Sequence, residues 1–452
     1  MTKRGRYSPD NLIRSEDLPF TPGEVVRLPE RLSDPNEIES WREKLRDPDQ
    51  PKVIDLFCGA GGMSEGFASA GFTVAAAFDH DPMAVSTFAA NLPGRVVCTD
   101  IDAIQDPASM LTDLEALGVS GIDVIIGGPP CQGFSQVGKA RIRSLAEEEQ
   151  ARLLARNEMF QHYFRFVEAM RPAMFVMENV PTLATFENGA YMQAIKRECQ
   201  RLDYDMDYEI IDSADYGVPQ TRRRLIIVGS RMGMLFTWPR KVHQQDRVVL
   251  GDAIGDLPAV KPPSLMERLP YRPQEPLSVY QRLMRSRVKP EDRDGIYDHV
   301  VRPVRKDDIE IFRHMTPGDR YIDIDERYRR YNSESFKDKY YMLRPDAPGV
   351  TITAHLAKDG YRYIHWDPEQ HRTISVREAA RIQSFGDHYR FAGSRSARYK
   401  HIGNAVPPLM AQRIAEQVLR ALRRGSGWLP GDMIQPGLPG MERQTQLITL
   451  FE

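Results

Sequence analysis

Short apolar runs and amphipathic stretches alternate along the chain from Val53 to about residue 240. The apolar runs are brief and rich in β-branched or aromatic side chains, which predicts buried strands. They are Val53–Phe57, Thr73–Phe78, Val124–Ile126, Phe175–Met177 and Leu225–Val228. Between the first two, Met63, Phe67 and Ala70 recur at helical spacing until Gly71. This alternation predicts an α/β fold with a mostly parallel, doubly wound sheet covered on both faces.

The periodicity changes outside this region. Residues 1–50 are polar and are interpreted as an extension with one helix around Asn36–Arg46. Residues 245–370 hold many Pro, Arg and Tyr without clear periodicity, which predicts a separate, loop-rich module. Helical patterns resume at Val376–Gln383 and Leu409–Leu422, and a tail rich in Gly and Pro follows.

Composition narrows the protein class only slightly. The chain has 452 residues, of which 41% are hydrophobic, so it can bury a large core. We expect a cytoplasmic protein, because we find neither a run of about 18 apolar residues nor a secretory leader. Its 4 cysteines are scattered, which argues against disulfides or a zinc site. The net charge of −2 leaves nucleic acid open, because a local basic face suffices to neutralise phosphates.

Unusual residues cluster where predicted strands end, which is the edge at which doubly wound sheets bind ligands. The glycine-rich turn Cys58–Gly62 follows the first strand, and Asp79 is placed to bind ribose hydroxyls. Ser64 stands where the dinucleotide fingerprint has its third glycine, so a nucleoside such as S-adenosylmethionine fits better than a dinucleotide. A plain tight turn is the alternative.

Two reactive groups follow later strands. Cys131 comes after two prolines that stiffen the backbone, which makes it a candidate nucleophile, although a lone cysteine is more often a small buried hydrophobe. Glu178 directly follows an apolar strand, and a carboxyl buried there can carry a proton at neutral pH. A helix cap or a salt bridge is the alternative for this glutamate.

A polar segment precedes the last predicted strand. In an extended chain Gln220, Arg222 and Arg224 share one face, where they could hold a phosphate and a carbonyl oxygen. An ordinary solvated strand end is the alternative.

In combination and order, these motifs resemble those of DNA (cytosine-5)-methyltransferases. They are DLFCGAGG, GGPPCQGFS, ENV at Glu178–Val180, QTRRR at Gln220–Arg224 and GNAVPP at Gly403–Pro408. Ser375–Phe391 resembles the segment that anchors the target-recognition domain of that family. The resemblance covers about residues 53–423, and the combination is specific although each motif alone is modest. It implies a Rossmann-like methyltransferase fold.

The resemblance also implies a domain organisation. Residues 1–50 would be an N-terminal extension, 51–244 the catalytic domain and 245–375 the target-recognition domain. Residues 376–423 would return to the catalytic domain with a C-terminal helix, and 424–452 would form a tail.

The family mechanism, carried onto matching positions, assigns four residues to catalysis. A cytosine turned out of the duplex would be attacked at carbon 6 by Cys131, while Glu178 protonates ring nitrogen 3 and Arg224 holds the exocyclic oxygen. Arg222 would support the same site or bind a backbone phosphate. The resemblance further implies that Gln132 and Ser135 lie on a loop that closes over the DNA.

S-adenosylmethionine is the cofactor that the resemblance implies, with no metal. Its methionine part is expected against Phe57, Gly59, Gly61 and Asn404, its ribose at Asp79 and its adenine at Asp100 and Ile101. Asp79 departs from the family, which often has Glu there, so the ribose geometry is in question. The residues Gly62, Pro130 and Val406 of the same motifs complete the expected cofactor site.

Duplex DNA is the implied partner. Arg344, Thr351 and Thr353 resemble the DNA-facing core of the recognition domain, where groove readout is expected. We expect a monomer on DNA, and a restriction partner, another phage-defence system or an orphan enzyme all stay open.

Three other functions are weighed against this one. Methyltransferases of the same family that act on tRNA lack a long recognition module, whereas about 130 residues occupy that place here. A catalytically silent DNA-binding protein would not need Cys131, Glu178 and Arg224 together. A nicotinamide-dependent dehydrogenase rests on the glycine turn alone and leaves the later motifs unexplained.

Overall fold

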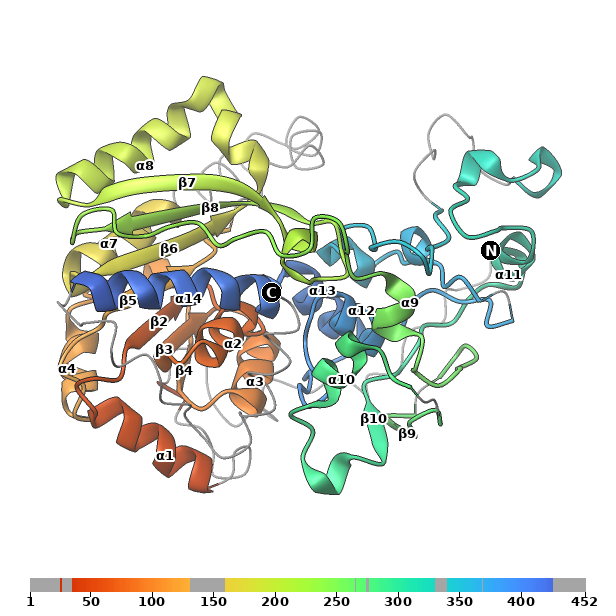
Figure 1. Cartoon of the computed structure of the whole chain (residues 1–452), viewed down its shortest axis with the longest axis horizontal. Helices are drawn as coiled ribbons and strands as arrows, with labels where there is room; N and C mark the ends of the chain where they lie inside the picture. Colours follow the sequence, from red (N-terminus) through yellow and green to blue (C-terminus); the bar gives the residue numbers. More distant parts are fainter. Residues whose placement is uncertain are drawn as a thin grey trace, which may run out of the picture.

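A computed structural model gives the fold of this chain and describes residues 25–26, 35–130, 159–264, 266–273, 276–329, 340–367 and 369–425. Figure 1 shows two lobes, one built around a large sheet and one built from short helices and turns. Within the described ranges, no helix has the length and apolar character to cross a bilayer.

The first lobe contains a sheet in which eight described strands follow the order β1-β4-β3-β2-β5-β6-β8-β7. The strands are β1 (Val25–Val26), β2 (Lys52–Leu56), β3 (Thr73–Asp79), β4 (Arg95–Cys98), β5 (Val124–Gly127), β6 (Met174–Asn179), β7 (Asp205–Asp212) and β8 (Arg223–Ser230). Strands β2 to β6 pair in parallel, whereas β1, β7 and β8 are antiparallel. The strand order reverses between β2 and β5, and sheets of this class bind ligands at the carboxyl ends of the strands at such a reversal. The predicted fold class is confirmed.

Helices cover both faces of this sheet. One face carries α2 (Gly62–Ser69), α3 (Pro82–Asn91) and α14 (Pro408–Gly425), and the other carries α1 (Pro35–Arg46), α4 (Ser109–Glu115), α7 (Met159–Met170) and α8 (Ala190–Arg201). Strand side chains alternate between the two cores, so that Val124 and Ile126 join the first and Ile125 the second. Burial on both sides explains the unbroken apolar runs of the sequence.

The late helix α14 completes the first face. It packs against α2, and Figure 1 shows it crossing the sheet from the far end of the chain. Gly66 allows this contact, because a Cβ there would lie 2.5 Å from the Cβ of Ala411 and 2.6 Å from the carbonyl oxygen of Pro408. Segments about 350 residues apart in sequence therefore share one core.

The second lobe contains short elements. They are α9 (Leu250–Ile254), α10 (Val279–Arg285), α11 (Lys306–Arg313), α12 (Val376–Ile382), α13 (Arg395–Asn404), β9 (Arg268–Pro270) and β10 (Gly295–Tyr297). Segments of 3₁₀ helix join the elements of both lobes: η3 (Ile101–Ala103), η5 (Pro181–Gly189), η6 (Ser213–Tyr216), η7 (Pro290–Asp292), η8 (Tyr321–Asp323), η9 (Glu326–Tyr328), η10 (Ala354–Ala357) and η11 (Tyr361–Tyr363). Helices α12 and α13 share an apolar core with α9 and α10.

The core of the second lobe contains buried arginines, which interrupt the pattern of apolar residues in its sequence. Arg381 is fully buried and forms salt bridges with Asp256 and Asp387. Arg372 is equally buried and pairs with Glu378. Because these charged side chains lie inside the fold, their positions look like surface positions in a pattern of apolar and polar residues.

Candidate active site

Most of the predicted site residues lie at the carboxyl edge of the parallel strands. Phe57 and Gly59 follow β2, Asp79 ends β3, Pro130 comes shortly after β5, and Glu178 is the penultimate residue of β6. Val406 comes from the segment between α13 and α14 and contacts the same edge, because a Cβ at Gly62 would lie 2.3 Å from the carbonyl oxygen of Val406. The predicted convergence of these strand ends is therefore present.

The glycine-rich turn requires left-handed backbone at three alternate positions. Phe57, Gly59 and Gly61 have φ values of 62°, 53° and 83°. A Cβ at Gly61 would lie 2.8 Å from the hydroxyl of Tyr389, so this glycine is needed for packing. A Cβ at Gly59 would meet nothing within 4 Å, so the turn leaves open space beside its backbone at this point.

Asp79 fixes the glycine turn. One carboxylate oxygen accepts a hydrogen bond from the backbone N–H of Gly59 at 2.8 Å, and the other accepts one from the N–H of Asp81 at 2.8 Å. The side chain retains 11% exposure, so its remaining lone pairs face the same edge as Gly59.

Asp81, which the sequence did not single out, is hydrogen-bonded to α13. The Asp81 carboxylate caps α3 and accepts hydrogen bonds from Lys400 at 2.7 Å and His401 at 3.2 Å. Burial opposes ionisation of Asp81, but the bonds from His401 and Lys400 outweigh it and lower its pKa. This link positions the end of α13, where Asn404 is exposed. The Asp-Pro pair at 81–82 signals the cap in the sequence but not its partners.

The two residues predicted to bind adenine differ in exposure. Asp100 is exposed and precedes η3. The side chain of Ile101 is 1% exposed and packs in the second core of the sheet. This burial leaves the backbone of Ile101, rather than its side chain, as the group that can meet a ligand at this edge.

Glu178 and Arg224 form a salt bridge, with 2.8 Å between Oε1 of Glu178 and Nε of Arg224. Glu178 stands opposite Ile226 in the antiparallel pairing of β6 and β8, so Arg224 is its diagonal neighbour on the same face. The two side chains are 12% and 14% exposed. The salt bridge that was the alternative for Glu178 thus exists, and its partner is another predicted site residue.

The loop after β5 contacts this ion pair. A Cβ at Gly128 would lie 3.1 Å from Oε2 of Glu178, so the glycine brings the loop backbone next to the carboxylate. The side-chain amide of Asn179 donates to the carbonyl oxygen of Pro129 at 3.1 Å. Half-buried Pro130 is the last described residue of this loop. The predicted residues Cys131, Gln132 and Ser135 lie outside the described residues.

The three described cysteines are poor nucleophiles. Cys58, Cys98 and Cys199 are all buried. Burial raises the pKa of the Cys58 thiol, and it raises the pKa of Cys98 to about 11 and that of Cys199 to about 12. Their thiols therefore stay protonated at neutral pH.

Gln220 and Arg222 are buried and hydrogen-bonded to backbone groups, so of the two roles predicted for Arg222 the geometry favours support of the site over contact with a phosphate. The guanidinium of Arg222 donates to the carbonyl oxygens of Ile352 at 2.7 Å and Gly403 at 3.2 Å. Arg222 is 1% exposed, which leaves no surface for a phosphate, and burial lowers its pKa. Gln220 is fully buried and accepts from the N–H of Ile352 at 2.6 Å. These side chains therefore point into the junction of three chain regions, where they hold Ile352 and Gly403 next to the start of β8.

The predicted DNA-facing residues separate into two places. The hydroxyl of Thr351 donates to the carbonyl oxygen of Thr221 at 2.7 Å, three residues before Arg224, and Thr353 is exposed nearby in sequence. Arg344 is exposed and pairs with Asp346 at 2.8 Å. The threonine segment therefore contacts the chain three residues before Arg224.

Comparison with known proteins places these motifs in a family. The family model for C-5 cytosine-specific DNA methylase matches residues 51–420. Type II methyltransferase M.AgeI of Thalassovita gelatinovora is 34% identical, with 82% of this chain and 100% of the relative covered. Type II methyltransferase M.XorII of Xanthomonas oryzae pv. oryzae is also 34% identical, with 83% and 86% covered.

Solved structures share the fold. A crystal structure of an E. coli prophage-encoded protein, described as a DNA modification methyltransferase, has a TM-score of 0.66 and 26% identity. The alignment covers 83% of this chain and 100% of that one. The methyltransferase EhMeth of Entamoeba histolytica, at 15% identity and a TM-score of 0.53, covers 83% of this chain and 99% of its own and supports the fold alone.

Proposed function

Because this chain belongs to the C-5 cytosine-specific DNA methylase family and is a DNA cytosine-5 methyltransferase, we propose that it methylates one cytosine within a specific duplex sequence by base flipping and a covalent bond to Cys131. The salt bridge between Glu178 and Arg224, in contact with the loop that leads to Cys131, is the observation that carries this proposal. It brings a proton donor and a hydrogen-bond donor to the place where the sequence puts the nucleophile.

The chemistry requires these groups because carbon 5 of cytosine is too electron-poor to attack a methyl donor unaided. The Cys131 thiolate forms a bond to carbon 6 while Glu178 donates a proton to nitrogen 3, which makes carbon 5 nucleophilic. Arg224 uses Nε for Glu178 and Nη1 for the carbonyl of Arg223, and its Nη2 is then directed to the exocyclic oxygen of the base. After methyl transfer, loss of the carbon 5 proton breaks the bond to Cys131.

The cofactor edge fits S-adenosylmethionine. Open space beside Gly59, the half-buried ring of Phe57 and the carboxylates of Asp79 and Asp100 suit a nucleoside with a cationic sulfur. Bound there, the cofactor supplies an electrophilic methyl group. The residues proposed to hold it are Phe57, Gly59, Gly61, Gly62, Asp79, Asp100, Pro130, Asn404, Val406 and the backbone of Ile101.

We assign recognition of the DNA to residues 245–375, which we call the recognition module. Thr351 and Thr353 would approach the duplex beside the catalytic pair and Arg344 further away, with one protein molecule on each site. Residues 51–244 and 376–423 would form the catalytic domain, with α12 and α13 packed against α9 and α10 of the recognition module. The relatives are named type II methyltransferases, which supports a role in restriction-modification or another phage-defence system.

The test is methyl transfer to duplex DNA. Purified protein, radiolabelled S-adenosylmethionine and a library of random duplexes should give 5-methylcytosine at one sequence, read by bisulfite sequencing. Glu178→Gln should lower kcat roughly 10²- to 10⁴-fold, because the proton donor is lost. Glu168→Gln is the matched control, since Glu168 also pairs with an arginine but lies half-exposed on the surface. Transfer to no duplex, or full activity of Glu178→Gln, would contradict the proposal.

A further inference from the structure

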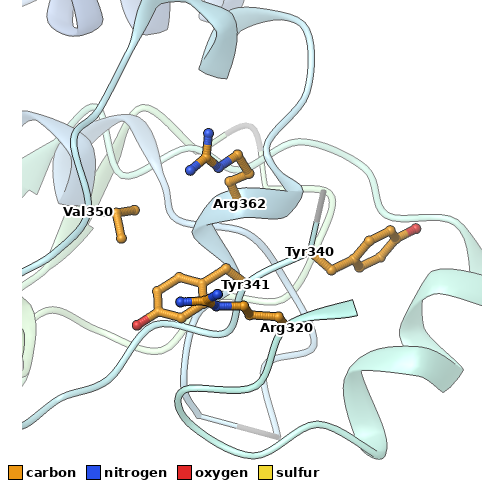
Figure 2. Close-up of a pocket in the computed structure, with 5 residues that line it drawn as sticks. All are labelled: Arg320, Tyr340, Tyr341, Val350 and Arg362. Carbon is orange, nitrogen blue, oxygen red and sulfur yellow. The ribbon is translucent and has the colours of Figure 1, made fainter. Parts of the chain in front are cut away.

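A small pocket lined by arginine, tyrosine and valine side chains lies in the recognition module. Its volume is about 160 Å³, and it is lined by Arg320, Tyr340, Tyr341, Val350 and Arg362 (Figure 2). Pockets that enclose a whole small molecule usually measure about 300 to 1,000 Å³. This pocket therefore fits only part of a ligand, such as one edge of a base in a larger nucleic acid.

Backbone pairing holds the pocket walls in place. Arg320 and Tyr341 are direct partners in an antiparallel bridge, so their side chains lie on the same side. The backbone N–H of Tyr341 donates to the carbonyl oxygen of Tyr361 at 2.8 Å, which brings the neighbouring Arg362 to the pocket. Tyr340 is fully buried below, and its hydroxyl donates to Asp308 at 2.8 Å. The walls are thus part of a paired scaffold.

The pocket presents two arginines without acidic partners. Arg320 and Arg362 are exposed, and no salt bridge in the described part of the chain involves either of them. Figure 2 shows Arg320 and Tyr341 on one side of the opening and Arg362 on another. A guanidinium offers a planar fork of N–H donors. A ligand edge with two adjacent hydrogen-bond acceptors is complementary to these N–H donors.

The pocket is linked to the proposed catalytic pair by a short path along the chain. Val350 precedes Thr351, whose hydroxyl donates to the carbonyl oxygen of Thr221, three residues before Arg224. Because an extended residue spans about 3.3 Å, this path places the pocket edge at most roughly 20 Å from Arg224. Successive bases in one DNA strand rise about 3.4 Å, so a base within roughly five steps of the target cytosine is within reach.

We propose that this pocket reads a guanine of the recognition sequence, with Arg320 and Arg362 donating to its O6 and N7 atoms. The inference rests on the proposed function and adds a specificity site to Arg344, Thr351 and Thr353. Guanine presents two adjacent acceptors in the major groove, and arginine is their commonest partner. A phosphate would also accept these bonds, but it requires neither a concave site nor the apolar walls of Tyr341 and Val350.

The experiment compares variants on a random duplex library with bisulfite sequencing of the products. Arg320→Ala and Arg362→Ala should relax the same G·C position in the methylated sequence. On the wild-type sequence each should lower kcat/KM by roughly 5- to 150-fold. Arg362→Lys should not restore the base preference, because lysine lacks the planar fork. Arg313→Ala, an exposed arginine on the same module, is the control and should leave the profile unchanged.

Two results would overturn the inference. One is an equal loss of methylation on all sequences that Arg362→Lys restores, which would identify a phosphate contact. The other is a wild-type profile and rate in both alanine variants, which would remove the pocket from the DNA interface. If the wild-type protein methylates no duplex at all, the proposed function fails instead, so the two failures are distinguishable.

Discussion

Replacing Arg222 by alanine should destabilise the fold and spare catalysis, whereas replacing Arg224 should do the reverse. The two arginines are two residues apart, but Arg222 binds the buried carbonyls of Ile352 and Gly403 while Arg224 pairs with Glu178 at the proposed catalytic edge. Arg222 joins β8 to the recognition module and to the end of α13. Its removal leaves two buried acceptors without donors.

The structure sets the size of this effect. A hydrogen bond from a charged donor contributes roughly 1.5–3 kcal/mol, and a buried unsatisfied acceptor costs about 1–3 kcal/mol. The buried Arg222 guanidinium contacts no carboxylate, so relief of its own desolvation offsets part of the loss. We expect Arg222→Ala to lower the free energy of unfolding by about 3 kcal/mol, against about 1 kcal/mol for Arg224→Ala. Because Arg224 acts on the base, its loss should lower kcat roughly 10²- to 10³-fold.

Urea unfolding followed by tryptophan fluorescence measures stability, and kcat is measured without urea on the folded fraction. Arg222→Lys, which retains one donor, should fall between the wild-type protein and Arg222→Ala in stability. The reasoning fails if Arg222→Ala unfolds at the wild-type urea concentration. It also fails if folded Arg222→Ala loses as much kcat as Arg224→Ala, because Arg222 would then contact the substrate.

Three further predictions concern the core, the helix packing and the recognition module. Burial raises the pKa of the Asp55 carboxyl to about 7, whereas the same group in the unfolded chain has a pKa of about 3.9. Between these two values the native protein keeps a proton that the unfolded chain releases. The free energy of unfolding should therefore fall by up to roughly 4 kcal/mol as the pH rises from about 4 to 7. Urea unfolding at pH 5 and pH 8 should show a smaller difference for Asp55→Asn than for the wild-type protein, and equal differences would count against this. Gly66→Val should cost about 1–3 kcal/mol or more by crowding α14, and an unchanged melting temperature would refute that packing. Exchange of residues 245–375 for the segment of a relative with another target should change the methylated sequence, and an unchanged sequence would place specificity elsewhere.

The sequence predicts the sheet well because its signal is local. The runs around Val53, Val124 and Phe175 are apolar because both faces of the parallel strands are buried. The edge strand β7 lacks such a run, since most of its residues are only partly buried, and it escaped prediction. The same local logic placed Glu178 at a strand end, where the structure has it.

Contacts between distant segments could not be predicted in this way. Asp81 meets Lys400 across more than 300 positions, and no local pattern records that pair. Arg222 reads as a basic surface residue next to Arg224, yet its donors satisfy carbonyls at the junction of the two lobes. The pocket at Arg362 likewise depends on bridges between segments without periodicity of their own.

Covalent trapping tests the central claim most directly. Wild-type protein, S-adenosylmethionine and a target duplex carrying 5-fluorocytosine should form a stable complex, because fluorine at carbon 5 cannot leave as a proton does and Cys131 stays bound to carbon 6. Intact mass should equal protein plus methylated DNA, and peptide mapping should place the bond on Cys131. Cys131→Ser should bind the cofactor but form no such complex. A complex that persists in Cys131→Ser, or a bond mapped to Cys58, Cys98 or Cys199, would contradict the account.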